Sequence, residues 1–245
     1  MLNQPIINIS GYRFVTLYNT RSLKPWLQEV CAQLQLKGSI VLAPEGINVM
    51  LAGTRSAIDQ FNTTLHQDRR LAGMEFKESA STQQPFQKLL VKCKASLVPG
   101  AEDVRPDQGD VAASLSPAEL KAWYEEQRDF IIIDTRNAYE LEHGTFEGAV
   151  NLQLEQFAEF PEKLEAAFGD HKDKPIVLFC TGGIRCEKGA PKALKMGFKQ
   201  VYQLDGGILN YFKHCGSAHY QGSCFVFDER VALNPELQPT DTTAV

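Results

Sequence analysis

The sequence has few cysteines, no long apolar run and no internal repeat. Six cysteines in 245 residues are too few for the disulfide framework of a secreted protein. No apolar run approaches the roughly 20 residues that cross a bilayer, and residues 1–5 lack the basic flank and apolar core of a signal peptide. Hydrophobic residues make up 43% and charged residues 22%, which excludes a disordered or collagenous chain. We therefore expect a globular, cytoplasmic protein with reduced thiols and no membrane partner.

Charge is distributed unevenly along the chain, whose net charge is -5. Residues 1–100 hold 11 Lys/Arg and 6 Asp/Glu, whereas residues 101–245 hold 14 and 24. A basic half can dock a phosphate backbone even when the whole chain is acidic. Two domains with different surfaces and no polyanionic partner would give the same asymmetry.

The N-terminal pattern predicts a ferredoxin-like (acylphosphatase-like) domain over residues 1–97. Strand-like and helical runs alternate there in the order β-α-β-β-α-β, with one further strand at the end, which favours two helices on one sheet. The strands are expected at 12–18, 39–43, 47–52, 74–78 and 86–92, and the helices at 23–36 and 54–65. Residues 98–112 are rich in Pro, Gly and charge and lack periodicity, so we expect a linker there.

Beyond the linker, the pattern predicts a parallel-sheet α/β domain over residues 113–216. Two β-branched runs, 130–134 and 175–179, are typical of strands buried on both faces. Helical segments alternate with such strands, which indicates βαβ units. We expect residues 217–245 to form a C-terminal extension that ends in a mobile, polar tail.

The loop after strand 175–179 carries the chemistry. Ligands of an open parallel sheet bind beyond the C-terminal ends of its strands. Glycines allow the loop to curl so that backbone N–H groups face the Cys180 sulfur, where they favour a thiolate or a persulfide. Arg185 adds a positive charge for an anionic substrate or intermediate. The expected loop consists of Cys180, Thr181, Gly182, Gly183, Ile184, Arg185 and Cys186.

Two interpretations of Cys186 stay open, and no bound cofactor is evident. Cys186 can act as a resolving thiol for Cys180, or it can be the buried first residue of a helix. No dinucleotide-binding G-x-G-x-x-G motif is present. The C-terminal histidines and cysteines lack the C-x-x-C pairs of a zinc site, so we expect no metal. These residues are His214, Cys215, His219 and Cys224.

Residues 116–215 resemble a rhodanese domain. The landmarks, in rhodanese order, are Asp134-Thr135-Arg136, His143 to Ala149 with Asn151, the loop 180–186 and Asp205-Gly206-Gly207. The resemblance implies that Cys180 corresponds to the persulfide-forming cysteine. We expect Arg136 to pair with a nearby carboxylate such as Glu140 and so to orient the loop.

A narrower resemblance, over about residues 10–232, is to the bacterial tRNA uridine(34) hydroxylases. It rests on residues 181–188, 201–209 and 224–231, and on Ala43-Pro44-Glu45-Gly46-Ile47-Asn48 in the first domain. The chain departs from the family at Ala95-Ser96-Leu97-Val98, where a Glu-Ile-Val stretch is typical, and it lacks the longer cysteine-rich C-terminal tail of many members.

This resemblance implies oxygen-dependent 5-hydroxylation of the wobble uridine in the tRNA anticodon loop. Molecular oxygen and an unidentified reductant would be co-substrates. The Cys180 thiolate would add to C6 of the uracil and activate C5. A sulfurtransferase that carries a persulfide on Cys180 is one alternative, and a noncatalytic tRNA- or protein-binding module is another.

Four lysines are candidates for tRNA binding. Lys88, Lys92 and Lys94 are an even number of residues apart, so an unbulged strand places them on one face. Lys188 lies on the helix after the loop and could reach a phosphate. Ordinary solvated charges would give the same patterns.

Overall fold

The computed structural model describes residues 5–240 of the chain, which divides into two compact units. The first unit extends to Leu97 and includes the later tripeptide Asp228–Arg230, whereas the second comprises Val98–Phe227 and the chain from Val231 onward. Part of the tail predicted to be mobile, residues 241–245, lies outside the described residues. Residues 234–240 form a turn, in which the Asn234 N–H donates to the Gln238 carbonyl at 2.9 Å.

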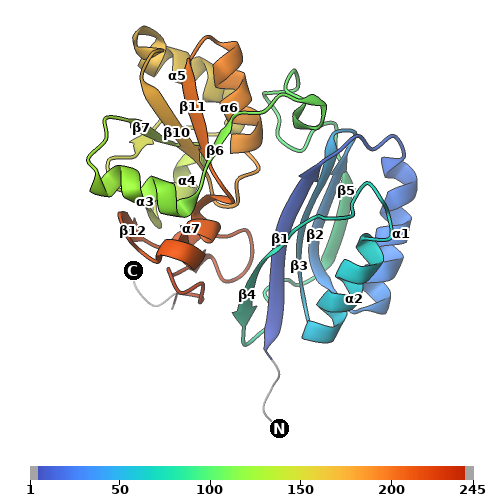
Figure 1. Ribbon diagram of the computed structural model, residues 1–245. Coiled ribbons are helices and arrows are strands. Elements are labelled where there is room, and N and C mark those ends of the chain that lie inside the picture. The colour runs from blue at the N-terminus through green and yellow to red at the C-terminus, as the bar shows by residue number, and fades with distance from the viewer. Residues whose placement is uncertain (1–4, 241–245) are drawn as a thin grey trace. The chain divides into compact units, whose positions relative to one another are not determined.

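The first unit is a five-stranded sheet with both helices on one face (Figure 1). The strand order is β4-β1-β3-β2-β5, with β5 parallel to β2 and the other neighbours antiparallel. This architecture confirms the predicted ferredoxin-like sandwich. The elements are β1 (Ile6–Phe14), α1 (Thr20–Gln33), β2 (Lys37–Ala43), β3 (Gly46–Gly53), α2 (Arg55–Leu65), β4 (Lys77–Ser81) and β5 (Leu89–Cys93).

Alternating apolar residues build the core of this unit. Ile40 and Val49, on neighbouring strands, are fully buried and share one core with Phe61 of α2. The side chain of Thr54 caps α2 by accepting the Ala57 N–H, as the sequence predicts. The first strand extends from Ile6 to Phe14 instead of over 12–18, because β1 pairs with β4 from Ile6 and with β3 from Ile7 onward.

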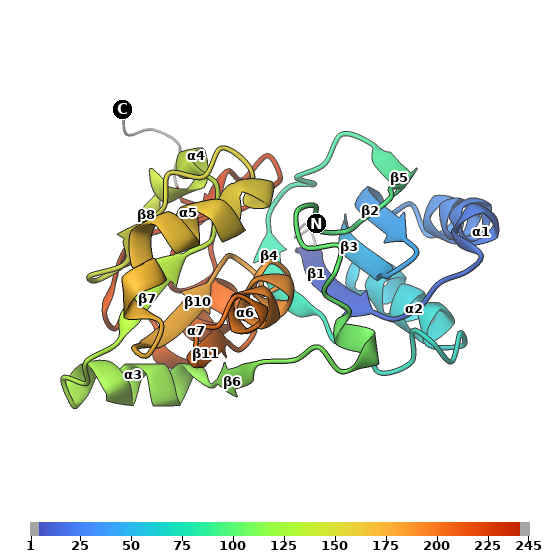
Figure 2. The same ribbon diagram turned by 90° about the horizontal axis from the view of Figure 1, so that it is seen from above.

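The second unit is an α/β fold on a parallel five-stranded sheet, with α5 on one side of the strands and α3 on the other (Figure 2). The strand order is β6-β11-β10-β7-β9. This confirms the predicted parallel-sheet domain. The strands are β6 (Ala113–Leu115), β7 (Ile131–Asp134), β9 (Val150–Asn151), β10 (Pro175–Phe179) and β11 (Gln200–Leu204). The helices are α3 (Pro117–Glu125), α4 (Ala138–Leu141), α5 (Phe160–Phe168), α6 (Cys186–Lys195) and α7 (Gly207–Cys215).

Short elements complete the second unit. Strand β8 pairs with β12, and β13 pairs with β14, both antiparallel. Their bounds, with those of three 3-10 helices, are β8 (Gly144–Phe146), β12 (Tyr220–Gly222), β13 (Cys224–Phe225), β14 (Ala232–Leu233), η1 (Pro106–Gln108), η2 (Phe157–Glu159) and η3 (Gly169–His171). Within residues 5–240, no helix combines the length and the apolarity that a bilayer crossing requires.

The segment expected as a linker, 98–112, packs into the second unit. Val98, Ala101 and Val104 are buried there. Two lysines of α6 bind the same segment through ion pairs, Lys192 with Asp103 at 3.0 Å and Lys195 with Asp110 at 2.8 Å. The segment is therefore a fixed part of the fold beside α6.

Candidate active site at the Cys180 loop

Cys180 lies directly after β10, and α6 begins six residues later at Cys186. The Cys180 side chain is fully buried, and its sulfur accepts a hydrogen bond of 3.1 Å from the Gly183 N–H. Gly183 has a φ of 99°, a conformation that residues with a Cβ rarely adopt. The loop thus curls back on the sulfur as the glycines predict.

The surroundings of Cys180 stabilise a thiolate. Burial by itself raises the pKa of this thiol, but a hydrogen bond from the Cys186 thiol, the charge of Arg185 and the backbone N–H groups of Arg185 and Gly183 together lower the pKa to about 5. Burial and the neighbouring Cys180 thiolate raise the pKa of Cys186 well above its ordinary value. At neutral pH the pair therefore consists of one thiolate, on Cys180, and one protonated thiol.

Arg185 is held by a buried carboxylate. Its Nη1 and Nη2 lie 2.5 and 2.8 Å from the two oxygens of Glu140, whose side chain has no exposed surface. Burial lowers the pKa of Arg185, but the ion pair with Glu140 outweighs it, so the guanidinium stays charged. Because Glu140 occupies both terminal nitrogens, Arg185 acts on the sulfur through its charge and its backbone N–H. The positive charge expected of Arg185 therefore acts on the Cys180 sulfur, and its role toward a substrate stays a prediction.

A second buried ion pair lies behind the first. Arg136 Nη2 is 2.6 Å from Asp134 Oδ2, and neither side chain is exposed. Arg136 also donates to the backbone oxygens of Glu140 and Gly144, at 3.3 and 2.6 Å. Arg136 therefore pairs with a nearby carboxylate as predicted, but the partner is Asp134 and not Glu140. Asp134, two residues away, turns back onto Arg136 and also accepts its backbone N–H at 3.1 Å.

The start of α7 binds the Cys180 loop through two backbone hydrogen bonds. Ile208 N–H donates to the Cys180 carbonyl at 2.9 Å, and Leu209 N–H donates to the Thr181 carbonyl at 3.1 Å. A Cβ on Gly207 would lie 2.4 Å from the Cys180 oxygen, and Gly207 has a φ of 66°. Only glycine permits this close approach.

Glu140 and Gly207 have structural roles that the motifs alone do not reveal. Glu140 lies three residues after Asn137, the N-cap of α4, so the spacing Asn137-x-x-Glu140 is a signal that was available in the sequence. The Asn137 N–H donates to Glu140 Oε1 at 3.0 Å, which leaves the carboxylate aimed at Arg185.

The four candidate RNA-binding lysines separate into two classes. Lys88, Lys92 and Lys94 are exposed, and in β5 Lys92 alternates with the core residues Leu89 and Val91, so it lies on the face of the sheet without helices. Lys188 is fully buried, and its Nζ donates to the Val104 carbonyl at 2.8 Å. The prediction that Lys188 meets a phosphate is therefore wrong in this structure, because the 98–112 segment covers it.

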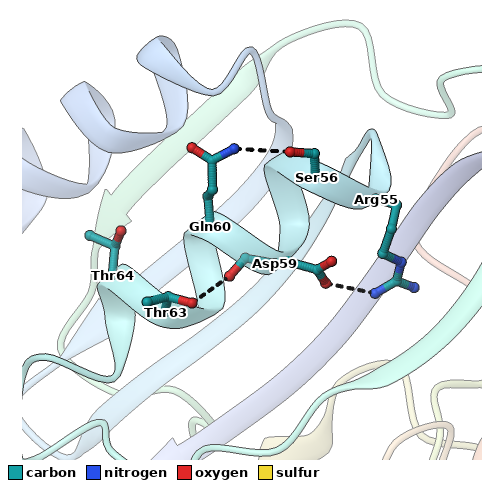
Figure 3. A pocket seen from close by; sticks show the side chains of 6 residues that line it. All are labelled: Arg55, Ser56, Asp59, Gln60, Thr63 and Thr64. Atoms are coloured by element: carbon teal, nitrogen blue, oxygen red, sulfur yellow. Dashed lines mark hydrogen bonds and ion pairs between the residues drawn. The ribbon is translucent and has the colours of Figure 1, made fainter.

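The other features that the sequence singled out carry no comparable chemistry. His219 stacks on Tyr124, and His214 Nδ1 lies 2.9 Å from the Asn210 carbonyl. Among residues 5–240, no three or more His, Cys, Asp or Glu side chains are grouped so that they could hold a metal ion. The hollow along α2 is lined by polar side chains that largely bond one another (Figure 3). Arg55 binds Asp59 there at 3.0 Å, and Gln60 donates to Ser56 at 3.0 Å.

Comparison with known families agrees with this architecture. Residues 6–97 match the family described as UPF0176 acylphosphatase like domain, and residues 116–214 match the Rhodanese-like domain. Among solved structures, the Alr3790 protein from Anabaena sp. is similar at 18% identity with a TM-score of 0.38, over 44% of this chain and 90% of that one. That likeness is too weak to carry an argument.

Curated relatives match nearly the whole chain. A protein of Cupriavidus necator named tRNA uridine(34) hydroxylase is 48% identical over 240 residues, which cover 96% of this chain and 85% of that protein. A protein of the same name from Paraburkholderia xenovorans is 45% identical over 248 residues, covering 97% and 86%. At this identity and coverage, the chain belongs to the tRNA uridine(34) hydroxylase family.

Proposed function

We propose that this protein hydroxylates C5 of the wobble uridine of tRNA, with Cys180 as the nucleophile. The observation that carries the proposal is the buried sulfur of Cys180, which accepts the Gly183 N–H at 3.1 Å, in a chain that is 48% identical to a curated tRNA uridine(34) hydroxylase. These surroundings lower the pKa of the thiol to about 5. A nucleophilic cysteine needs this kind of environment, in which charge and backbone N–H groups hold it deprotonated at neutral pH. We also propose that the reaction takes place in the cytoplasm, where tRNA serves translation.

The chemistry follows from the thiolate. Addition of the Cys180 sulfur to C6 of the uracil makes C5 an enolate carbon, which attacks molecular oxygen and forms a hydroperoxide at C5. Two electrons and two protons reduce the hydroperoxide to a hydroxyl group and water. Loss of the C5 proton and departure of the sulfur from C6 then release 5-hydroxyuridine. Backbone N–H groups at the loop can stabilise the charge that develops on the base carbonyl.

We propose that the two electrons and two protons come from a reductant outside the fold, such as a dithiol, whose oxidation to a disulfide releases both. Cys180 cannot supply them at this step, because its sulfur is bonded to C6 and cannot pair with Cys186 until it has left. Cys186 instead donates a hydrogen bond to the Cys180 thiolate before the addition, which helps to keep that thiol deprotonated.

Access to the sulfur requires the substrate base to leave its stack. Cys180 has no exposed surface, so the side chains over the loop must move when the base enters. Enzymes that modify a base take it out of the stack, and the bases of a single-stranded anticodon loop are readily splayed. The exposed Lys88, Lys92 and Lys94, in and beside β5, give the first unit cationic side chains that can bind the RNA backbone.

A sulfurtransferase is the second candidate, and the match to the Rhodanese-like domain favours it. The same loop would hold a persulfide on Cys180, with the loop N–H groups stabilising its negative charge. The two reactions differ in the atom that the uridine gains.

A covalent trap tests the nucleophile. A tRNA with 5-fluorouridine at the wobble position cannot lose a proton from C5, so the adduct on the protein should persist. We expect mass spectrometry to locate the adduct on Cys180 in the wild type and in the control Cys215→Ser, and to find none in Cys180→Ala. Persistence of the adduct in Cys180→Ala, or its absence from the wild type under turnover conditions, would contradict the proposal.

A further inference from the structure

Three aromatic side chains from distant parts of the second unit form one cluster. Tyr139 of α4 and Phe225 of β13 have ring centroids 5.4 Å apart at 85°, and Phe225 and Phe227 have centroids 5.2 Å apart at 89°. The ring of His143 lies 5.5 Å from that of Phe225. We refer to Tyr139, Phe225 and Phe227 as the aromatic cluster.

Two side chains of the aromatic cluster are more exposed than aromatic side chains usually are. Tyr139 is 48% exposed and Phe227 is 45% exposed, although aromatic rings in a folded domain are usually buried. Adjacent rings meet edge to face, an arrangement that fixes their orientation. Exposed apolar surface of this kind is typical of a binding site.

The cluster borders the Cys180 loop through two connections. The Thr181 hydroxyl donates to the Phe225 carbonyl at 3.4 Å, so the strand that carries Phe225 lies against the loop. Tyr139 directly precedes Glu140, the residue that holds Arg185. The aromatic surface and the nucleophile are therefore supported by the same short elements.

A uridine that enters the loop leaves its neighbours in the RNA without a stacking partner. Extruding a base costs unstacking energy, and proteins that bind single strands recover such energy by stacking bases on aromatic rings. The cluster has no charged side chain of its own, so it suits the flat face of a base better than a phosphate. The neighbouring bases of the target strand are thus the occupants whose chemistry fits.

We propose that the aromatic cluster is a stacking platform for a nucleobase that flanks the target uridine in single-stranded RNA. The proposal rests on the hydroxylase function proposed above and adds a substrate subsite to it. Tyr139 and Phe227 supply the exposed rings, and Phe225 holds them in place.

Fluorescence of a base analogue tests the platform directly. The probe is an RNA stem-loop with the anticodon-loop sequence, in which 2-aminopurine replaces a base next to uridine 34. Stacking on an aromatic ring should quench its emission when the full-length wild-type protein binds. Loss of one base-stacking contact corresponds to a loss of affinity of about 5- to 150-fold. We expect that loss, and loss of the quenching, in Phe227→Leu and in Tyr139→Leu.

Two further variants separate the loss of stacking from a general effect of substitution on folding or on RNA affinity. Tyr139→Phe keeps the ring and should retain both affinity and quenching, even where a leucine variant folds poorly in a thermal melt. Tyr18→Leu removes a tyrosine of the first unit that is 95% exposed and should change the affinity by less than about twofold, because it takes away no contact of this cluster.

The outcomes distinguish this proposal from the function on which it rests. Unchanged affinity and quenching in both leucine variants, with hydroxylation by the wild type intact, would overturn the platform alone. A change in self-association of the leucine variants, with RNA binding unaffected, would likewise overturn it and assign the cluster to contacts between copies of the chain. Absence of RNA binding by the wild type would overturn both proposals.

Discussion

Arg185 and Glu140 form a two-pronged ion pair, with N–O distances of 2.5 and 2.8 Å, beside the buried sulfur of Cys180. Glu140 fixes the position of the guanidinium, and the guanidinium in turn lowers the pKa of the thiol. The reactivity of Cys180 therefore depends on a carboxylate 40 positions earlier in the chain. This relationship leads to the first two predictions.

Replacing Glu140 by Gln should destabilise the second unit and disturb the thiol. The substitution leaves the buried guanidinium of Arg185 without a charged partner, and breaking a buried ion pair costs about 3 kcal/mol or more. Urea denaturation measures the loss of unfolding free energy. Glu142→Gln, at an exposed position two residues further on, is the control and should stay within about 0.5 kcal/mol of the wild type. Equal stability of the two variants would contradict the assigned role of Glu140.

Alkylation of Cys180 should depend on pH with a midpoint near 5. The pKa of this thiol is lowered to about 5, so the thiolate is fully formed at neutral pH and the alkylation rate should be level there. Peptide mass spectrometry after timed iodoacetamide treatment gives the rate at each pH. Arg185→Gln removes one of the lowering charges and should move the midpoint upward. A wild-type midpoint near 8.5, the ordinary value of a cysteine, would show that the loop does not activate the thiol.

The lowered pKa of Cys180 also makes the unfolding free energy of the protein depend on pH. The unfolded chain holds a proton on Cys180 up to about pH 8.5, whereas the folded chain releases it near pH 5. The unfolded state thus binds more protons between these values, so this group makes unfolding free energy rise with pH across that window. Cys180→Ser should flatten the rise, as measured by urea denaturation at several pH values. A slope identical to that of the wild type would contradict the lowered pKa.

Replacing Gly207 by Ala should damage the loop more than a comparable substitution in open space. A Cβ at Gly207 would overlap the Cys180 carbonyl oxygen at 2.4 Å, so the loop or α7 must shift. Gly148 has a similar φ of 69° but nothing within 4 Å of the added atom, so Gly148→Ala reports the backbone strain alone. We expect Gly207→Ala to cost about 1–3 kcal/mol more than this control, from overpacking. Thermal unfolding of both variants, with the alkylation rate of Cys180, provides the comparison, and equal effects would contradict the close approach.

The exposed lysines of the first unit should contribute uniformly to tRNA affinity. For every lysine that contacts a phosphate, replacement by Ala should reduce the slope of log affinity against log salt by about 1. The lysines to replace are Lys88, Lys92 and Lys94. Filter binding at several salt concentrations measures that slope. Lys199→Ala is the control, because Lys199 is exposed on the second unit and already pairs with Asp173 at 2.5 Å. A triple variant that keeps the wild-type slope would exclude these three lysines from the docking surface.

The sequence predicted those strands and helices that are specified by a short stretch of neighbouring residues. The run 175–179 and the loop glycines mark strand β10 and its turn, because a strand buried on both faces needs a continuous apolar run. The capping box at Ser116 likewise marks the start of α3. The polar residues Asn8 and Ser10 in β1 concealed the beginning of that strand, which is fixed by pairing with β4 and β3.

The side-chain partners depended on tertiary contacts and could not be derived in the same way. Arg136 and Arg185 both had carboxylates within reach in the sequence, and only the fold decides that Arg136 takes Asp134 and Arg185 takes Glu140. Lys188 resembles any solvated helix lysine until the 98–112 segment is placed over it. The aromatic cluster joins residues more than 80 positions apart, which no local pattern reports.

Cys180 should direct an oxygen atom from molecular oxygen to the wobble uridine. Undermodified tRNA is incubated with the protein under heavy-isotope oxygen gas, and its nucleosides are analysed by mass spectrometry for wild type and Cys180→Ala. We expect 5-hydroxyuridine that carries heavy oxygen with the wild type, and none with Cys180→Ala. The isotope is essential, because exchange of oxygen for sulfur changes the mass almost as much as addition of oxygen. Gain of sulfur without heavy oxygen, or heavy oxygen that persists in Cys180→Ala, would contradict a cysteine-dependent hydroxylation.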